Sequence, residues 1–178
     1  MKKTLLLLAH PDLKHSLINR TLVESIAMEP SMNIRDLYSL YSDINRIDVE
    51  EEQKQLIAHD RILIQFPLYW FSTPALLKEW QDRVLTYGFA YGEGGTKLVG
   101  KRCGIVFSAG SPETAYSSSG HNLHPIESYL LPLLGSIRYT GMEYGGSFGV
   151  YGALGMGIEA LSDETARYAT WLKEEGWL

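Results

Sequence analysis

Short apolar segments alternate with helix-forming segments along the whole chain, and this alternation limits the possible fold more than any other feature. The apolar segments are typical of buried strands, and the segments between them repeat apolar residues every three or four positions. This order of elements is typical of a parallel sheet that is covered by helices. An α/β fold is therefore predicted.

Five segments are predicted to form strands, and the first of them is apolar enough to be buried on both faces. The fifth contains several glycines, which are uncommon inside strands. The predicted strands span residues 4–9, 33–37, 61–66, 102–108 and 142–150.

Helices are predicted between these strands from their apolar spacing and from residues that favour helix starts. Ser16 is the expected cap of the first helix. Thr73 is the expected cap of another, with Pro74 at its first position, and Ser162 is expected to cap the last. The remaining predicted helical ranges are 48–59 and 126–139, and the last helix is expected to span 162–175.

Five strands joined by short crossovers point to a doubly wound parallel sheet with helices on both faces, in the flavodoxin-like arrangement. A single domain spanning residues 1–178 is expected, because the sequence contains no repeat or linker. Ligands of such sheets bind outside the carboxyl ends of the strands, where the strand order reverses. Three turns meet that description and form the predicted site: residues 10–19, 67–71 and 108–121.

Charge and cysteine content exclude some classes of function. The net charge of -5 argues against nucleic acid as a general partner. Cys103 is the only cysteine, which rules out an internal disulfide and a zinc site built from several thiolates, and it indicates a reducing, cytoplasmic location. The apolar run at residues 5–9 is far too short to cross a membrane, so no membrane insertion is expected.

The first of the three turns offers polar side chains at the start of a helix: His10, His15, Ser16 and Asn19. Free amides and the positive end of a helix dipole attract a phosphate group. The alternative is that Ser16 only caps the helix and that His10 is only a turn residue. No Gly-x-Gly-x-x-Gly motif follows the first strand, so a nicotinamide cofactor is expected to bind as a visiting substrate.

The second turn carries three adjacent aromatic residues, Tyr69, Trp70 and Phe71, between a strand and a helix that is opened by a proline. An aromatic cluster is more often part of a core or of a dimer contact than the wall of a cofactor site. Its place in a loop favours exposure, because loops lie mostly on the surface. Flat apolar surface beside free backbone amides suits a planar ring with polar edges, such as a flavin.

The third turn leaves its strand with small residues, at 108–112, which allow the backbone to approach a ring closely. Tyr116 and His121 follow it. A phenol and an imidazole beside a redox ring can stabilise negative charge and relay a proton, as hydride chemistry requires. The alternative is an exposed polar loop without a catalytic role.

Three other patterns are rejected as functional motifs. Residues 145–149 match the Gly-x-Ser-x-Gly elbow of serine hydrolases around Ser147, but no helix follows directly and no histidine lies beyond His124. Residues 95–101 resemble a phosphate-binding loop but precede a strand instead of following one. His121 and His124 have no evident carboxylate or thiolate partner, so no metal site is expected.

With these turns in place, the chain resembles the NAD(P)H:quinone oxidoreductase family of flavodoxin-like flavoproteins, over almost its whole length. That family includes small bacterial quinone reductases associated with glutathione-gated potassium efflux. Weaker support comes from residues 88–92 and 100–101. The resemblance rests mainly on Ala-His-Pro at 9–11 with residues 16–19, and on Phe-Pro-Leu-Tyr-Trp-Phe-Ser-Thr-Pro-Ala-Leu-Leu-Lys-Glu-Trp at 66–80.

The resemblance implies a role for residues in all three turns. Tyr116 and His121 match the family's catalytic tyrosine and histidine. The third turn reads Ser-Ala-Gly-Ser where the family often has Thr-Thr-Gly-Gly, and the long C-terminal extension that helps larger members to hold FAD is absent, so FMN is favoured and FAD stays open. The residues implied in cofactor binding are His10, Ser16, Leu17, Ile18, Asn19, Pro67, Leu68, Tyr69, Trp70, Phe71, Ser108, Ala109, Gly110 and Ser111.

The activity that the resemblance implies is the two-electron reduction of quinones by NAD(P)H, with the two substrates alternating in one pocket. The family also implies a homodimer in which each pocket is completed by the other subunit. An alternative from another class is a regulatory accessory subunit that associates peripherally with a potassium efflux channel, with oxidoreduction secondary. A serine esterase that uses Ser147 is a remote third alternative.

Overall fold

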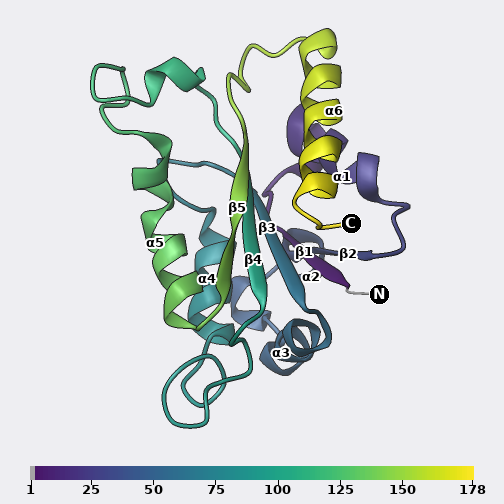
Figure 1. The fold of residues 1–178 in the computed structure, drawn as a ribbon, viewed down its shortest axis with the longest axis vertical. Coiled ribbons are helices and arrows are strands. Elements are labelled where there is room, and N and C mark those ends of the chain that lie inside the picture. Colours follow the sequence, from purple (N-terminus) through teal and green to yellow (C-terminus); the bar gives the residue numbers. More distant parts are fainter. Residues whose placement is uncertain (1–2) are drawn as a thin grey trace.

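The computed structural model describes residues 3–178, and within them five strands form one parallel sheet (Figure 1). The strand order is β2-β1-β3-β4-β5, which is the order of flavodoxin-like sheets and confirms the predicted fold. The order reverses between β1 and β3, where a ligand crevice is expected. The strands are β1 (Thr4–Leu8), β2 (Met32–Asp36), β3 (Arg61–Pro67), β4 (Arg102–Ser108) and β5 (Glu143–Val150).

Helices cover both faces of this sheet, as the sequence predicts (Figure 1). The first and last helices, α1 and α6, lie together on one face, and the other helices lie on the opposite face. The helices are α1 (Leu17–Ile26), α2 (Leu37–Leu40), α3 (Val49–Ala58), α4 (Ala75–Val84), α5 (Ile126–Tyr139) and α6 (Ile158–Glu174).

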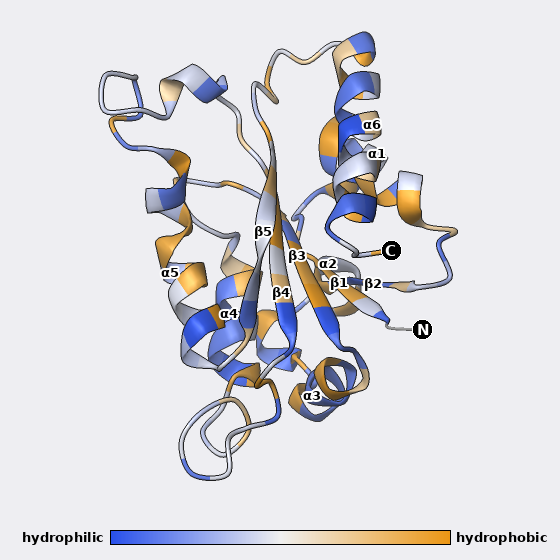
Figure 2. Cartoon of the chain, viewed as in Figure 1, coloured by the Kyte–Doolittle hydropathy of each residue, from blue (hydrophilic) through white to orange (hydrophobic). Residues whose placement is uncertain are grey.

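The strand β1 shows why its sequence is continuously apolar. Leu5 and Leu7 point into the core beneath α3, α4 and α5, whereas Leu6 points into the core beneath α1 and α6. A strand with helices on both sides has no solvent face, so the alternation of polar and apolar residues disappears. Figure 2 shows the same contrast, with β1 and β3 largely hydrophobic and α4 and α6 mixed in colour.

Two of the predicted helix caps are wrong. Pro74, not Thr73, is the N-cap of α4, because its extended backbone (ψ 151°) places the first helical residue at Ala75. The last helix begins at Ile158 with Gly157 as its N-cap, so Ser162 lies inside it. The apolar face of α6 extends N-terminally to the buried Leu161, whose burial favours the earlier start.

The glycines of β5 make room for aromatic rings. A Cβ atom on Gly149 would lie 2.3 Å from the ring of Phe107, and one on Gly145 would lie 2.7 Å from the ring of Trp177. This close approach explains a glycine-rich strand on packing grounds. All of residues 145–149 lie within β5, so Ser147 is not on the strand-to-helix turn that a hydrolase elbow requires.

Among residues 3–178, no helix is both long enough and apolar enough to cross a membrane.

Candidate functional site

An open pocket of about 560 Å³ lies at the carboxyl ends of β1, β3 and β4, next to the point where the strand order reverses. Its volume falls within the range of pockets that bind small molecules and cofactors. The pocket is lined by His10, Asp12, His15, Ser16, Leu17, Ile18, Asn19, Pro67, Leu68, Tyr69, Ser108, Gly110, Ala153 and Leu154.

The start of α1 presents backbone N–H groups to this pocket. The Ser16 hydroxyl accepts a hydrogen bond from the N–H of Asn19 (3.2 Å), which confirms Ser16 as the cap. The preceding N–H groups, those of Leu17 and Ile18, have no acceptor within the helix because of where they lie in its first turn. Both residues line the pocket, and the positive end of the helix dipole favours an anion there.

His10 lines the pocket, and a backbone contact selects the tautomer of its neutral ring. The N–H of Asp12 donates to His10 Nδ1 (3.1 Å), so the proton of the neutral ring is on Nε2. Burial lowers the pKa of His10, and the nearby carboxylates of Asp12 and Asp36 offset this only in part. At the exposed rim, His15 pairs with Asp12 (2.8 Å), and its hydrogen bond lowers the pKa of the Asp12 carboxyl.

A buried polar network underlies the pocket, and its members Asn19 and Ser108 form the pocket floor. The amide Nδ2 of Asn19 donates to Ser108 Oγ (2.9 Å), which joins α1 to the end of β4. Gln65 on β3 is wholly buried, and its Nε2 donates to the carbonyl oxygen (3.1 Å) and to Oδ1 (3.3 Å) of Asn19. Three elements that meet at the pocket are therefore tied together through one asparagine.

The second turn has a strained backbone. Trp70 and Phe71 have positive φ angles of 47° and 60°, a left-handed conformation that costs free energy for residues with a side chain. Backbone hydrogen bonds in both directions between Tyr69 and Ser72 (3.0 Å each) close the turn. Trp70 is 94% exposed, and the Phe71 ring stacks on Tyr129 of α5 with 4.9 Å between centroids.

A backbone hydrogen bond closes the third turn around the two predicted catalytic residues. The N–H of Asn122 donates to the carbonyl of Ala115 (2.9 Å), so that Tyr116 and His121 are the first and last residues of the enclosed loop. A Cβ atom on Gly120 would lie 2.3 Å from the same carbonyl oxygen. Only glycine therefore fits where the two arms of the loop meet. We call residues 115–122 the closed loop.

Tyr116 joins the closed loop to the aromatic residues of the neighbouring elements. Its ring lies 6.1 Å from that of Tyr129 and 5.8 Å from that of Tyr151. Because Tyr129 also stacks on Phe71, the second and third turns share one aromatic cluster. Burial raises the pKa of Tyr116, with a smaller opposing effect of the Ser111 hydrogen bond, so the phenol is protonated near neutral pH.

The structure gathers most of the predicted cofactor-binding residues at one pocket. Trp70, Phe71, Ala109 and Ser111 are not among its lining residues; the N–H of Ala109 instead donates to Val150 of β5 (2.8 Å). Those that line the pocket are His10, Ser16, Leu17, Ile18, Asn19, Pro67, Leu68, Tyr69, Ser108 and Gly110.

Sequence reasoning missed three residues of this region. Ala153 and Leu154 line the pocket from the turn after β5, and the rule that ligands bind at carboxyl ends of strands could have included that turn. Gln65 was missed because it lies inside an apolar strand. A glutamine in a buried strand must find polar partners, and this requirement is the signal that could have identified it.

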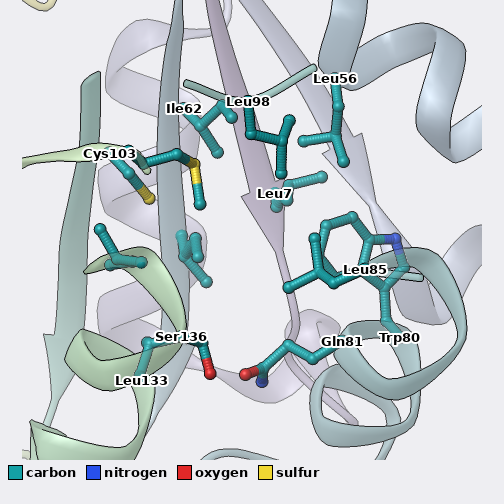
Figure 3. Close-up of a pocket in the computed structure, with 13 residues that line it drawn as sticks. Leu7, Leu56, Ile62, Trp80, Gln81, Leu85, Leu98, Cys103, Leu133 and Ser136 are labelled. Atoms are coloured by element: carbon teal, nitrogen blue, oxygen red, sulfur yellow. The ribbon is translucent and has the colours of Figure 1, made fainter. Parts of the chain in front are cut away.

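A second cavity lies inside the core and is not a ligand site. It has a volume of about 20 Å³, room for about one water molecule, and apolar side chains around Cys103 form most of its wall (Figure 3). At its edge, Gln81 and Ser136 point toward each other. Complete burial raises the pKa of Cys103 to about 12, so the thiol is unreactive in the folded protein.

Comparison with known proteins places the chain in a family. The model of a family described by its flavodoxin-like fold matches residues 2–174. The chain is 45% identical over 166 residues to a Bacillus subtilis (strain 168) protein named as an uncharacterized NAD(P)H oxidoreductase, YdeQ, covering 93% of this chain and 84% of the relative. It is 40% identical over 172 residues to the glutathione-regulated potassium-efflux system ancillary protein KefG of Cronobacter sakazakii, covering 97% and 93%.

Solved structures agree with this placement. General stress protein 14 of Treponema denticola, crystallised in complex with FMN, superposes with a TM-score of 0.91 at 32% identity and covers 97% of this chain and 99% of its own. An NADPH-quinone reductase from P. pentosaceus superposes with a TM-score of 0.85 at 31% identity, covering 95% and 96%.

Proposed function

Because this chain belongs to the family with the flavodoxin-like fold, we propose that it is an FMN-dependent NAD(P)H oxidoreductase that reduces quinones by two electrons. The observation that carries the proposal is the juxtaposition in one pocket of the α1 amides, the polar floor and Tyr69. Phosphate, polyol and aromatic ring are the three chemical parts of FMN, and this pocket offers a complementary surface to each.

The donors of the pocket fit FMN. The N–H groups of Leu17 and Ile18 and the Ser16 hydroxyl would hold its phosphate at the positive end of the α1 dipole. Ser108 and Gly110 would hold the polar edge of its ring, and Tyr69 would contact a flat face. FMN, when bound, supplies the hydride-accepting and hydride-donating chemistry that side chains lack.

Tyr116 and His121 are the proposed catalytic residues. Near neutral pH the Tyr116 phenol keeps its proton, so it can donate a hydrogen bond to negative charge that develops during hydride transfer. His121 is exposed at the other end of the closed loop, where it can exchange a proton with solvent and deliver it to the product. Neither side chain lines the pocket, and their shared loop would bring both groups to the bound substrate together.

We expect NAD(P)H and the quinone to use the same space in turn. The aromatic cluster of Phe71, Tyr116 and Tyr129 would offer flat apolar surface to either substrate. Alternate use of one space gives ping-pong kinetics, with parallel lines in double-reciprocal plots. Intersecting lines would contradict the shared pocket.

A homodimer is part of the proposal. Aromatic and aliphatic side chains are exposed on α5 and on the turns beside it, namely Leu131, Tyr139, Trp70 and Leu123. Exposed apolar surface of this kind favours a protein contact. A monomer by light scattering at the enzyme's working concentration would contradict it.

The second candidate function is that of an accessory subunit of a glutathione-regulated potassium efflux system, and the 40% identity to KefG favours it. The two functions are compatible, since the same fold could bind FMN and a channel. The accessory role predicts a change in potassium efflux when the protein is added to a channel in vesicles, also with catalytically inactive variants. If efflux does not change, the accessory role is contradicted and the oxidoreductase function is the only one of the two proposals that remains.

The direct test of the proposed enzyme is its colour. We expect the purified protein to be yellow, to bleach under anaerobic addition of NADH or NADPH, and to regain its colour when a quinone is added. Chromatography of the released pigment should identify FMN. A colourless protein that takes up neither FMN nor FAD on reconstitution would overturn the proposal.

A further inference from the structure

The direction of the hydrogen bonds in the pocket floor is determined by one group that can only accept. The backbone carbonyl oxygen of Asn19 lies 3.1 Å from the Gln65 amide, and a carbonyl has no hydrogen to donate. Gln65 must therefore present its NH₂ group, not its oxygen, to Asn19.

This orientation of Gln65 determines that of the Asn19 amide. The same Gln65 NH₂ group lies 3.3 Å from the side-chain oxygen of Asn19, so Oδ1 of Asn19 accepts there. The Nδ2 group of Asn19 is then on the other side and donates to Ser108 Oγ (2.9 Å). A flipped Asn19 amide would bring its NH₂ group against the NH₂ group of Gln65.

The orientation of Asn19 in turn determines what Ser108 can do. Its hydroxyl oxygen accepts from Asn19, so its hydrogen must be directed away from Asn19. Ser108 lines the pocket, so a ligand bound there could accept a hydrogen bond from its hydroxyl. Gln65 itself is wholly buried and does not line the pocket.

The same arrangement leaves one buried oxygen atom without a hydrogen bond within the described part of the chain, which lowers the stability of the fold. Gln65 Oε1 is buried and has no hydrogen-bond partner among residues 3–178. A buried acceptor without a partner is unfavourable, so stability alone does not account for a glutamine at this position.

We propose that Gln65 is a positioning residue that orients the Asn19 amide and so makes Ser108 a hydrogen-bond donor to the bound cofactor. This inference rests on the proposed function in one respect, that the ligand of the pocket is FMN. Gln65 acts without touching the ligand, through two hydrogen bonds in series.

A double-mutant cycle on FMN affinity tests the proposal, with FMN binding to apoprotein measured by flavin fluorescence. Ser108→Ala removes the donor, and Gln65→Met removes the group that orients it. We expect each to raise the Kd about three- to tenfold, the range for one hydrogen bond. If Gln65 acts through Ser108, the double variant should bind FMN no worse than Ser108→Ala alone. Multiplying effects, or an unchanged Kd in Gln65→Met, would overturn the proposal.

Gln53→Met is the matched control. Gln53 on α3 also donates from Nε2 to a backbone carbonyl, that of Val84 (2.9 Å), and to a side-chain oxygen, that of Thr86 (3.1 Å), away from the pocket. It should lower stability without changing the Kd for FMN. An equal rise in Kd in this variant would show that the effect of Gln65→Met comes from general loosening and would overturn the positioning role.

Two further measurements keep the test decisive. If Gln65→Met does not fold, Gln65→Glu replaces it. The deprotonated carboxylate of that variant repels the Asn19 oxygens, so FMN affinity should fall as the pH rises. An FMN affinity that does not change with pH would overturn the proposal. NMR of the side-chain amide of Asn19 in the apoprotein should show slow hydrogen exchange that Gln65→Met accelerates. A fast-exchanging amide in the unmodified apoprotein would overturn the inference, whereas failure of that protein to bind FMN would overturn only the proposed function.

Discussion

The backbone N–H of Asn122 donates to the carbonyl oxygen of Ala115 and closes a loop that begins at Tyr116 and ends at His121. The bond joins the two ends of the loop, so the backbones of Tyr116 and His121 lie at the same end of it, although neither side chain lines the pocket. The position of the loop is further constrained because the Tyr129 hydroxyl of α5 donates to the carbonyl of Asn122. Both proposed catalytic groups therefore depend on the same backbone contacts.

Gly120→Ala should impair catalysis by opening the closed loop. Its new Cβ atom would collide with the Ala115 carbonyl, so Tyr116 and His121 should move apart. We expect the rate of flavin reduction by NAD(P)H to fall about ten- to a hundredfold, as misplacement of reacting groups by about 1 Å does, with FMN still bound. Stopped-flow absorbance measures this rate. Gly157→Ala, where a Cβ meets nothing within 4 Å, is the control and should leave the rate unchanged.

Tyr116→Phe and His121→Ala test the catalytic groups themselves. Loss of a proton donor or charge-stabilising group should slow flavin reduction about a hundredfold, while the Kd for FMN changes little. Both the rate and the Kd can be measured on the same preparations. Unchanged turnover in both variants would remove the two residues from the mechanism.

Trp70→Asn should raise the stability of the fold and weaken substrate binding. Asparagine tolerates the left-handed backbone at this position better than tryptophan, and the 94% exposed ring contributes little packing. We expect the apoprotein to gain up to about 1 kcal/mol in the free energy of unfolding, measured with urea. The KM for quinone should rise, because Trp70, although it does not line the pocket, belongs to the turn that the family resemblance assigns to ring binding. A loss of stability would show that the ring is buried by a contact, such as a partner subunit.

His10 should make stability depend on pH in one direction. Burial lowers its pKa in the folded state below the ordinary 6.5, so the unfolded chain takes up the proton first as the pH falls. The stability that neutral His10 contributes is intact above pH 6.5 and is lost as the pH falls through the folded-state pKa. His10→Asn keeps an acceptor for the Asp12 N–H but does not titrate, so its unfolding free energy should fall less steeply below pH 6.5.

His124→Asn is the control for this prediction, since it removes an exposed imidazole outside the pocket. Urea unfolding above and below the ordinary histidine pKa measures all three proteins. Equal pH slopes for His10→Asn and the unmodified protein would contradict the assigned role of burial at His10. An NMR titration of the His10 ring gives the folded-state pKa directly.

The fold could be predicted because strands buried on both faces leave an unmistakable apolar run, as Leu5 to Leu8 do. The helix starts at Thr73 and Ser162 were misplaced for a local reason. Serine and threonine favour caps, but a proline and a glycine beside a longer apolar face decided where these helices begin. At the N-termini of both α4 and α6, tertiary packing outweighed the local capping preference.

The site was predictable where its residues follow strands, because the carboxyl ends of all strands in a parallel sheet lie at the same edge of the sheet. His10, Asn19 and Ser108 meet there as expected. What sequence could not supply was the coupling among them. That depends on the side-chain direction of Gln65 and on the backbone bond between Ala115 and Asn122, neither of which has a local pattern.

Because Cys103 is buried, the rate at which its thiol reacts reports how often the folded protein opens locally. It is the only thiol in the chain, it lies on the inner strand β4, and its raised pKa keeps it protonated while it is buried. A disulfide-exchanging dye can react with Cys103 only when local unfolding exposes β4 to solvent. The labelling rate therefore measures how often this opening occurs. A ligand that binds only the closed protein should slow the labelling by the same factor by which it shifts the unfolding equilibrium.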